Sequence, residues 1–244
     1  MSARLAFRAS IVHCVGDPHK SAEHAIEYFD DGILLVNQGR VEAVGDATSL
    51  ISLYALTEDA IVDYTGQLIM PGFVDIHMHY SQTDIIASYG NQLLEWLEKY
   101  TFPAEQKFID HAHALQSAQF FVDELLRNGT TTAMLFCTIH PQSVDALFSV
   151  AEQYNLRVIA GKVMMDRNCP ELLRDTAEQG YTESQQLIDR WHGVKRLHYA
   201  VTPRFAPTSS ERQLELSGQL YRENPGVYLQ SHVAENHKEV QWVA

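Results

Sequence analysis

The segment from residue 67 to residue 79, QLIMPGFVDIHMH, is an apolar run that ends in two histidines separated by one residue. Side chains alternate between the two faces of a strand, so His77 and His79 project to the same side. Their imidazole nitrogens can then each approach one zinc ion to about 2.1 Å. Two polar residues at an exposed strand end would show the same spacing, but the PGFVDxHxH context favours a metal site.

A second pair of histidines with the same spacing, His111 and His113, gives a comparison. This pair lies in a segment of helical period, and residues two apart in a helix do not face each other. We therefore expect these two side chains to be solvated and to bind no metal. The remaining histidines outside the candidate site have no ligand-like context: His13, His19, His24, His140, His192, His198 and His237.

A further histidine, His232, ends another apolar run, and Glu235 follows it. The strands of an α/β barrel bring their C-terminal ends to one mouth, where the catalytic groups lie. His232 can therefore join the first pair although it is distant in sequence. Glu235 could act beside the metal as an acid and base that moves a proton from water to a leaving amine. The alternative is a solvated glutamate stabilised by a helix dipole.

The elements that must position these residues are strands alternating with helices from residue 67 onward. The expected strands are 67–80, 131–137, 157–163, 197–202 and 227–232. The expected helices are 92–100, 110–128, 141–154, 182–192 and 209–224. Repetition of strand and helix predicts a parallel α/β sheet or barrel.

The N-terminal segment is different, because it reads as short strands alone. They are expected at 5–15, 32–36, 40–44 and 61–64. Asn37-Gln38-Gly39 predicts a hairpin between the second and third of them. We therefore predict two domains, a small β domain over 1–66 and an α/β catalytic domain over 67–244.

Two motifs, PGFVDIHMH at 71–79 and HVAE at 232–235, resemble those of the amidohydrolase superfamily. Three more resemble the guanine deaminases within it: HYSQ at 79–82, SYGNQLLEWLEKYTFPAE at 88–105 and TPRFAPTSS at 202–210. The resemblance implies an α/β fold, a (βα) barrel of the amidohydrolase type with a small β-sandwich domain to which the N-terminal segment contributes. It implies hydrolytic deamination of guanine to xanthine and ammonia by a metal-activated water, in a cytoplasmic homodimer.

The resemblance also implies a role for each candidate residue of the metal site. His77, His79 and His232 would bind the metal, with one zinc ion per subunit. Iron or manganese would suit the same histidines, because imidazole binds several divalent metals. Glu235 would be the catalytic proton shuttle.

The implied substrate-binding residues are His79, Gln82, Arg204 and Phe205. Gln82 and Arg204 would hydrogen-bond the purine, with Arg204 directed at its carbonyl oxygen, and Phe205 would pack against the ring. An aromatic face with a few placed donors suits a planar polar base. The alternatives are a surface cation for Arg204 and a core aromatic for Phe205. Trp96 could line the same pocket, but a tryptophan in an amphipathic helix is more often a core residue, so we do not assign it to the site.

The sequence departs from the family in how many strands it contains. The family barrel has eight strands, and we count five here. By resemblance, a further histidine and an aspartate of the family's site would follow later than residue 244. We therefore expect an incomplete barrel from the N-terminal part of a longer enzyme, and a 244-residue chain that is inactive and poorly soluble by itself. Two alternatives stay open: another amino-purine or triazine amidohydrolase, and an inactive truncated fragment that acts as a binding module.

Composition limits the partners. The net charge of −13, from 31 acidic and 18 basic residues, repels phosphate backbones, so we expect no nucleic-acid polymer as partner. No basic tract suits an anionic membrane, and no apolar run approaches the roughly 20 residues of a membrane span. The three cysteines lack C-x-x-C spacing, which favours reduced thiols in a cytoplasmic protein over disulfides or a thiolate metal site. The N-terminus lacks the apolar region of a secretory signal.

Overall fold

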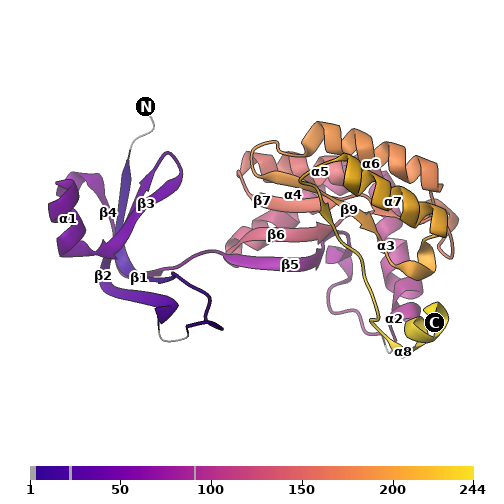
Figure 1. Cartoon of the computed structure of the whole chain (residues 1–244), viewed down its shortest axis with the longest axis horizontal. Helices are drawn as coiled ribbons and strands as arrows, with labels where there is room; N and C mark the ends of the chain where they lie inside the picture. The colour runs from indigo at the N-terminus through magenta and orange to yellow at the C-terminus, as the bar shows by residue number, and fades with distance from the viewer. Residues whose placement is uncertain (1–3, 22–23, 91) are drawn as a thin grey trace. The chain divides into compact units, whose positions relative to one another are not determined.

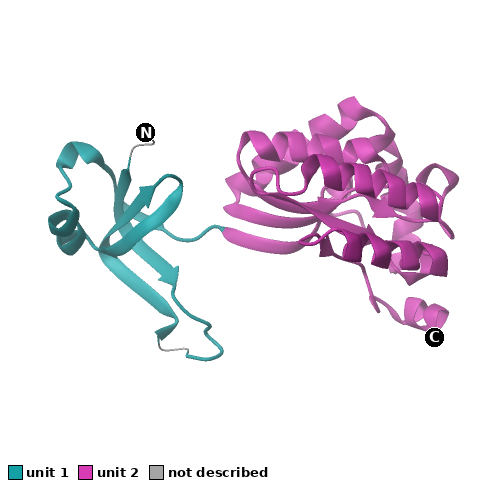
Figure 2. Cartoon of the chain, turned by 45° about the horizontal axis from the view of Figure 1, so that its top comes forward, with its two compact units in different colours: residues 1–72 teal, residues 73–244 magenta. Residues whose placement is uncertain are grey.

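The computed structural model describes residues 4–21, 24–90 and 92–244, and the chain divides into two compact units, Met1–Gly72 and Phe73–Ala244. Figure 1 shows the elements of each unit, and Figure 2 colours the two units separately. Asn91, which falls inside the motif at 88–105, lies outside the described residues, as do residues 1–3 and 22–23.

The first unit is a four-stranded sheet of order β3-β2-β1-β4. Its strands are β1 (Leu5–Cys14), β2 (Ile26–Asn37), β3 (Arg40–Asp46) and β4 (Ile61–Ile69). The expected hairpin joins β2 to β3 through Gln38 and Gly39, which have φ angles of +52° and +74° as such tight turns require. After β3 come helix α1 (Ala47–Tyr54) and a 3₁₀ turn η2 (Glu58–Ala60), neither of which the sequence led us to expect.

The strand expected over 67–80 is in fact divided between the two units. Its first residues belong to β4, where Leu68 and Ile69 pair with β1, and its last belong to β5 (Phe73–His79) in the second unit. The break falls at Met70-Pro71-Gly72, where proline offers no backbone N–H for a ladder. The domain boundary expected after residue 66 lies within β4.

The second unit is built on a parallel sheet of order β10-β9-β7-β6-β5. Its strands after β5 are β6 (Thr130–Phe136), β7 (Arg157–Gly161), β8 (Val163–Met164), β9 (Leu197–Pro203) and β10 (Tyr228–Leu229), of which β8 pairs only with β9 among the described residues. The expected strand 227–232 is therefore short. Beyond β10 the chain still follows β9 through single backbone bonds, from Gln230 N to Val201 O and from His232 N to Arg204 O.

Four helices cover one face of this sheet, as Figure 1 shows. They are α4 (His111–Arg127), α5 (Pro141–Gln153), α6 (Ala177–Trp191) and α7 (Glu211–Glu223). Side chains fix their N-terminal ends: Asp110 accepts from Ala112 N, and Ser210 accepts from Gln213 N. Helix α6 begins before the expected residue 182, because Thr176 caps it by accepting from Gln179 N.

Short elements follow the C-terminal ends of the strands or lie between the strands and the covering helices in sequence. They are η3 (Tyr80–Ile85), α2 (Leu93–Trp96), the π-helix η4 (Leu97–Thr101), α3 (Phe102–Gln106), η5 (Lys107–Ile109), η6 (Glu171–Leu173), η7 (Ala206–Thr208) and α8 (His237–Val243). Parallel strands in sequence order, with a covering helix after each of β5, β6, β7 and β9, form part of a (βα) barrel, and the first unit is a separate small β domain, as the sequence predicts. Within the described residues, no helix combines the length and apolarity needed to cross a membrane.

Candidate metal centre and substrate pocket

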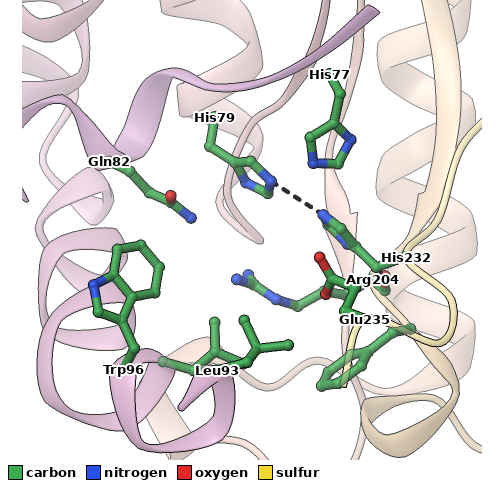
Figure 3. Close-up of a pocket in the computed structure, with 10 residues that line it drawn as sticks. His77, His79, Gln82, Leu93, Trp96, Arg204, His232 and Glu235 are labelled. Carbon is green, nitrogen blue, oxygen red and sulfur yellow. Dashed lines mark hydrogen bonds between the residues drawn. The ribbon is translucent and has the colours of Figure 1, made fainter. Parts of the chain in front are cut away.

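Three histidines meet at the C-terminal end of the parallel sheet. His77 and His79 lie at the end of β5, and His232 follows β10. Nitrogen atoms of all three lie within 4.8 Å of one another, and His79 Nε2 is 3.1 Å from His232 Nε2. Figure 3 shows the three imidazoles turned toward one another. The two-residue spacing on β5 and the position of His232 just beyond the C-terminal end of β10, at the other edge of the same curved sheet, therefore produce the cluster that we expected.

The donor atoms fit a divalent cation with nitrogen ligands. Two nitrogens about 2.1 Å from one ion in tetrahedral geometry lie roughly 3.4 Å apart, close to the His79 to His232 distance. His232 Nδ1 lies 2.9 Å from the Arg204 carbonyl oxygen, to which it donates, so its Nε2 keeps a lone pair for a metal.

The protonation state of these imidazoles suits the same role. Burial lowers the pKa of His79 well below its usual range, and the positive charge of Arg204 adds to that shift. Burial also lowers the pKa of His232 to about 4, although its hydrogen bond to the Arg204 carbonyl opposes the change. Neutral imidazole is the form that binds metals, and both side chains are neutral at physiological pH.

The second pair of histidines with the same spacing, His111 and His113, lies elsewhere in the fold. Both lie in the first turn of α4. His111 is exposed as expected, whereas His113, also expected to be solvated, is half-buried because its ring packs edge-on against Phe108 at 4.8 Å. Neither belongs to the histidine cluster.

Glu235 lines the same cavity as the histidines, in the turn before α8. The backbone N–H groups of Ala234 and Glu235 donate to the buried Glu239 carboxylate at 3.0 and 2.7 Å, and Ala234 has a φ of +56°. This turn directs the Glu235 side chain into the cavity. Burial raises the pKa of the Glu235 carboxyl, and the nearby Glu239 charge raises it further, so Glu235 holds a proton at higher pH than a free glutamate does.

The cavity has a volume of about 220 Å³, below the roughly 300–1,000 Å³ of pockets for drug-sized ligands. It therefore suits a small ligand. Its lining contains all of the sequence-predicted site residues and three apolar side chains from the α2–η4 segment: His77, His79, Gln82, Leu93, Trp96, Leu97, Arg204, Phe205, His232 and Glu235. Trp96, which we expected in the core, is a wall of this cavity, and its Nε1 donates to the Ser88 carbonyl at 3.3 Å.

Arg204 is not a surface cation. Its Nη1 donates to both carboxylate oxygens of Glu105, at 3.0 and 2.8 Å, and its guanidinium lies over the Phe102 ring at 5.5 Å. Burial raises the pKa of the Glu105 carboxyl, while Arg204 and a hydrogen bond from Gln82 oppose that rise. Because both oxygens of Glu105 accept from a guanidinium, which stays protonated in proteins, the pair is charged.

Phe205 is a core aromatic residue, as one interpretation expected, and it is also a wall of the cavity. It is 3% exposed and belongs to an apolar cluster with Leu97 and Phe102, and it also lines the cavity. A ring fixed in this way can present a rigid face to a planar ligand.

Sequence reasoning missed Glu105 and Glu239 beside the site. Both are buried carboxylates that hydrogen-bond to parts of the site. Glu105 accepts from the Arg204 side chain, and Glu239 accepts from the backbone N–H of Glu235. The only signal in the sequence was that Glu105 ends the motif at 88–105. It falls between the expected helices 92–100 and 110–128, and a lone glutamate in a connecting segment is normally solvated.

Comparisons with known proteins point in one direction. The sequence model of the amidohydrolase family matches residues 68–244. A guanine deaminase from Escherichia coli K12 is 48% identical over 234 residues, which cover 96% of this chain and 53% of that protein. The solved E. coli guanine deaminase superposes with a TM-score of 0.93 at 47% identity, over 98% of this chain and 56% of the other.

A third similar structure is described as a guanine deaminase from C. acetobutylicum with guanine bound in the active site. It has a TM-score of 0.87 and 27% identity, and the match covers 99% of this chain and 55% of that one. The chain thus spans about half the length of the relatives it matches.

Proposed function

Because this chain belongs to the amidohydrolase family, we propose that it forms the N-terminal part of a guanine deaminase, which hydrolyses guanine to xanthine and ammonia. One observation carries the proposal. The three histidines, Glu235 and the Gln82 and Arg204 pair, from segments far apart in sequence, all line one cavity at the C-terminal end of the parallel sheet. That is where α/β barrels place their catalytic groups.

Members of this family depend on a metal, and we propose that His77, His79 and His232 hold it here. Zinc is the ion we infer, one per subunit, since it favours nitrogen ligands in tetrahedral sites. When bound, such an ion would lower the pKa of a water toward neutrality.

The chain's own residues would orient the base and move the protons. Arg204 would donate to the purine carbonyl oxygen and Gln82 would hydrogen-bond the ring, while Phe205 and Trp96 supply apolar faces. Glu235 would take a proton from the water that adds to the amine-bearing ring carbon and give it to the leaving nitrogen, which departs as ammonia. The raised pKa of Glu235 supports this role, because the group must accept and release a proton near neutral pH.

We also propose that the enzyme is a cytoplasmic homodimer. The homodimer is proposed from the likeness to the guanine deaminases. The cytoplasm is proposed because the three cysteines are free, as is usual for proteins in a reducing compartment.

Two measurements test the proposal on the protein as its gene encodes it: ammonia release from guanine and bound metal by elemental analysis. We expect turnover and about one metal ion per chain. The His232→Ala variant should lose both, whereas His111→Ala, which changes an exposed histidine of the comparison pair, should keep both.

Two outcomes would count against the proposal in different ways. A protein that ignores guanine but deaminates adenine or an amino-triazine would support the alternative amidohydrolase assignment. Full metal content in His232→Ala would remove this histidine from the ligand set.

A further inference from the structure

Glu105 joins the two polar groups that the proposed function directs at the substrate ring. It lies in α3 with no exposed surface, and its carboxylate accepts from Arg204, 99 residues later in the chain. The Gln82 side chain, which comes from η3 directly after the first metal-binding strand, acts on the same carboxylate and lowers its pKa. One carboxylate therefore links two different walls of the cavity.

The contact with Glu105 uses only part of the Arg204 guanidinium. Both hydrogen bonds to Glu105 come from Nη1. A guanidinium has five N–H donors, so donors on the other nitrogens remain for a ligand. In Figure 3 the Arg204 side chain extends into the space between Gln82 and the histidines. Glu105 thus fixes the plane of the guanidinium while leaving part of it directed at the cavity.

The charge of the pair also matters, because it is buried. The side chains of Arg204 and Glu105 are 4% and 0% exposed, so water screens neither charge. A buried arginine without a partner would attract carboxylates and phosphates, which pair with it strongly. With Glu105 in place the charge is cancelled, and the best remaining acceptor for Arg204 is a neutral carbonyl oxygen.

We infer that Glu105 is a positioning residue that holds Arg204 and Gln82 in place and cancels the Arg204 charge, so that the cavity selects a neutral ring carbonyl over an anionic ligand. This inference rests on the proposed function. The competing interpretation is that the Arg204 and Glu105 pair only holds α3 against the end of β9. A pair with that role alone would affect stability but not the choice between neutral and anionic ligands.

Three variants of the protein as its gene encodes it separate these interpretations. Glu105→Gln removes the negative charge and keeps the side-chain shape. Glu105→Asp keeps the charge but shortens the reach to Arg204. Glu98→Gln is the matched control, because Glu98 is an exposed glutamate in the adjoining η4. The measurements are kcat and KM for guanine, inhibition by urate as an anionic oxopurine, and thermal unfolding.

The two Glu105 variants should differ in a defined way. We expect Glu105→Gln to raise the KM for guanine about tenfold with a smaller change in kcat, and to tighten urate inhibition about tenfold, because Arg204 is then uncompensated. Glu105→Asp should also raise the KM for guanine but leave urate inhibition weak. Glu98→Gln should match the wild type in every measurement.

The outcomes are decisive in each case. A folded Glu105→Gln protein with unchanged guanine KM and unchanged urate inhibition would overturn the inference. If Glu105→Gln does not fold, Glu105→Asp decides, since an unchanged guanine KM there would also overturn it. A wild-type protein that neither binds nor turns over guanine would overturn the proposed function and this inference together, whereas an active wild type with insensitive variants would overturn only the role of Glu105.

Discussion

Two side chains with different proposed roles are tied to one backbone group. The carbonyl oxygen of Arg204 accepts from both the backbone N–H and the Nδ1 of His232, each at 2.9 Å. The Arg204 side chain meanwhile reaches into the cavity. A shift in the end of β9 would therefore move a candidate metal ligand and a candidate substrate donor together. The proposed recognition of the ring and the proposed binding of the metal therefore depend on the same backbone group.

The proton-shuttle role of Glu235 predicts a selective loss of turnover. In Glu235→Gln we expect kcat to fall by about 10²–10⁴-fold, because an amide cannot accept and return the proton. Metal content should stay at the wild-type level, since the three histidines are intact. Ammonia release and elemental analysis check both. Glu211→Gln, at an exposed first-turn glutamate of α7, should change neither. Wild-type turnover by Glu235→Gln would favour a glutamate that only responds to a helix dipole.

The cysteines should react in an order set by burial and pKa. Burial, reinforced by the charge of Asp175, raises the pKa of Cys169 to about 11. Its thiolate fraction at pH 8 is then roughly one in a thousand. Iodoacetamide at pH 8 should modify the exposed Cys14 first and leave the buried Cys137 unmodified in the folded protein.

The pH dependence of alkylation isolates the effect of the thiol pKa. The rate at Cys169 should rise about tenfold per pH unit up to pH 11, as its thiolate fraction does. Peptide mass spectrometry at several pH values measures each site. Equal rates at Cys14 and Cys169 at pH 8 would contradict the expected order.

The sequence predicted the candidate residues whose position follows from local geometry. Alternation along one strand together with the PGFVDxHxH context predicted His77 and His79, and the C-terminal end of another strand of the same sheet predicted His232. Glu105 and Trp96 could not be assigned in this way, because their neighbours in the cavity come from elements remote in sequence. Helical spacing makes Trp96 look like a core residue, and only the tertiary arrangement reveals that one side of it faces a cavity.

At the scale of elements, one glycine determines how closely two strands of the parallel sheet approach. A Cβ atom placed on Gly161 at the end of β7 would lie 1.7 Å from the Ala200 carbonyl oxygen of β9. The obstacle is backbone, which cannot rotate away as a flexible side chain can. The contact between these strands therefore requires a residue without a side chain.

Gly161→Ala should destabilise the protein by about 3 kcal/mol or more, since the strands must separate to admit the methyl group. The midpoint of denaturant unfolding measures this. Gly218→Ala is the matched control in α7, where the new Cβ would meet only the flexible end of Arg222 at 3.3 Å. This control should gain about 0.5–1 kcal/mol, because alanine favours helix over glycine. Equal effects of the two substitutions would refute the argument.

Element prediction succeeded where periodicity was long and failed where elements were short. The expected helices 110–128 and 141–154 match α4 and α5 within one or two residues, because each has a full apolar stripe and a clear cap or proline at its start. The fifth strand was expected to reach His232, yet β10 stops at Leu229. The residues of the expected strand are apolar enough for a strand. Beyond Leu229, however, the chain makes only isolated backbone hydrogen bonds to β9 and to the residue that follows it.

At the scale of the whole molecule, the parallel sheet has two unpaired edges among the described residues. One edge is β5 and the other is β10. The β5 edge carries apolar side chains that are largely exposed: Phe73 at 56%, Val74 at 64% and Ile76 at 72%. An exposed apolar edge strand is a template for pairing with another chain. Closing a sheet into a full barrel removes such edges, because every strand then has a partner on both sides.

This edge predicts association of a polypeptide consisting of residues 1–244 alone. At micromolar concentration it should form species larger than a dimer, which size-exclusion chromatography with light scattering detects. Ile76→Lys should raise the fraction of small species, because a lysine on an edge strand opposes pairing with a second chain.

Ile109→Lys is the control for added charge. Ile109 is 61% exposed in the same unit but lies in η5 and not on the edge strand, so this variant should associate as the wild type does. If both variants changed the distribution equally, added charge alone would explain the effect, and a monodisperse wild-type polypeptide would show that the β5 edge does not drive association.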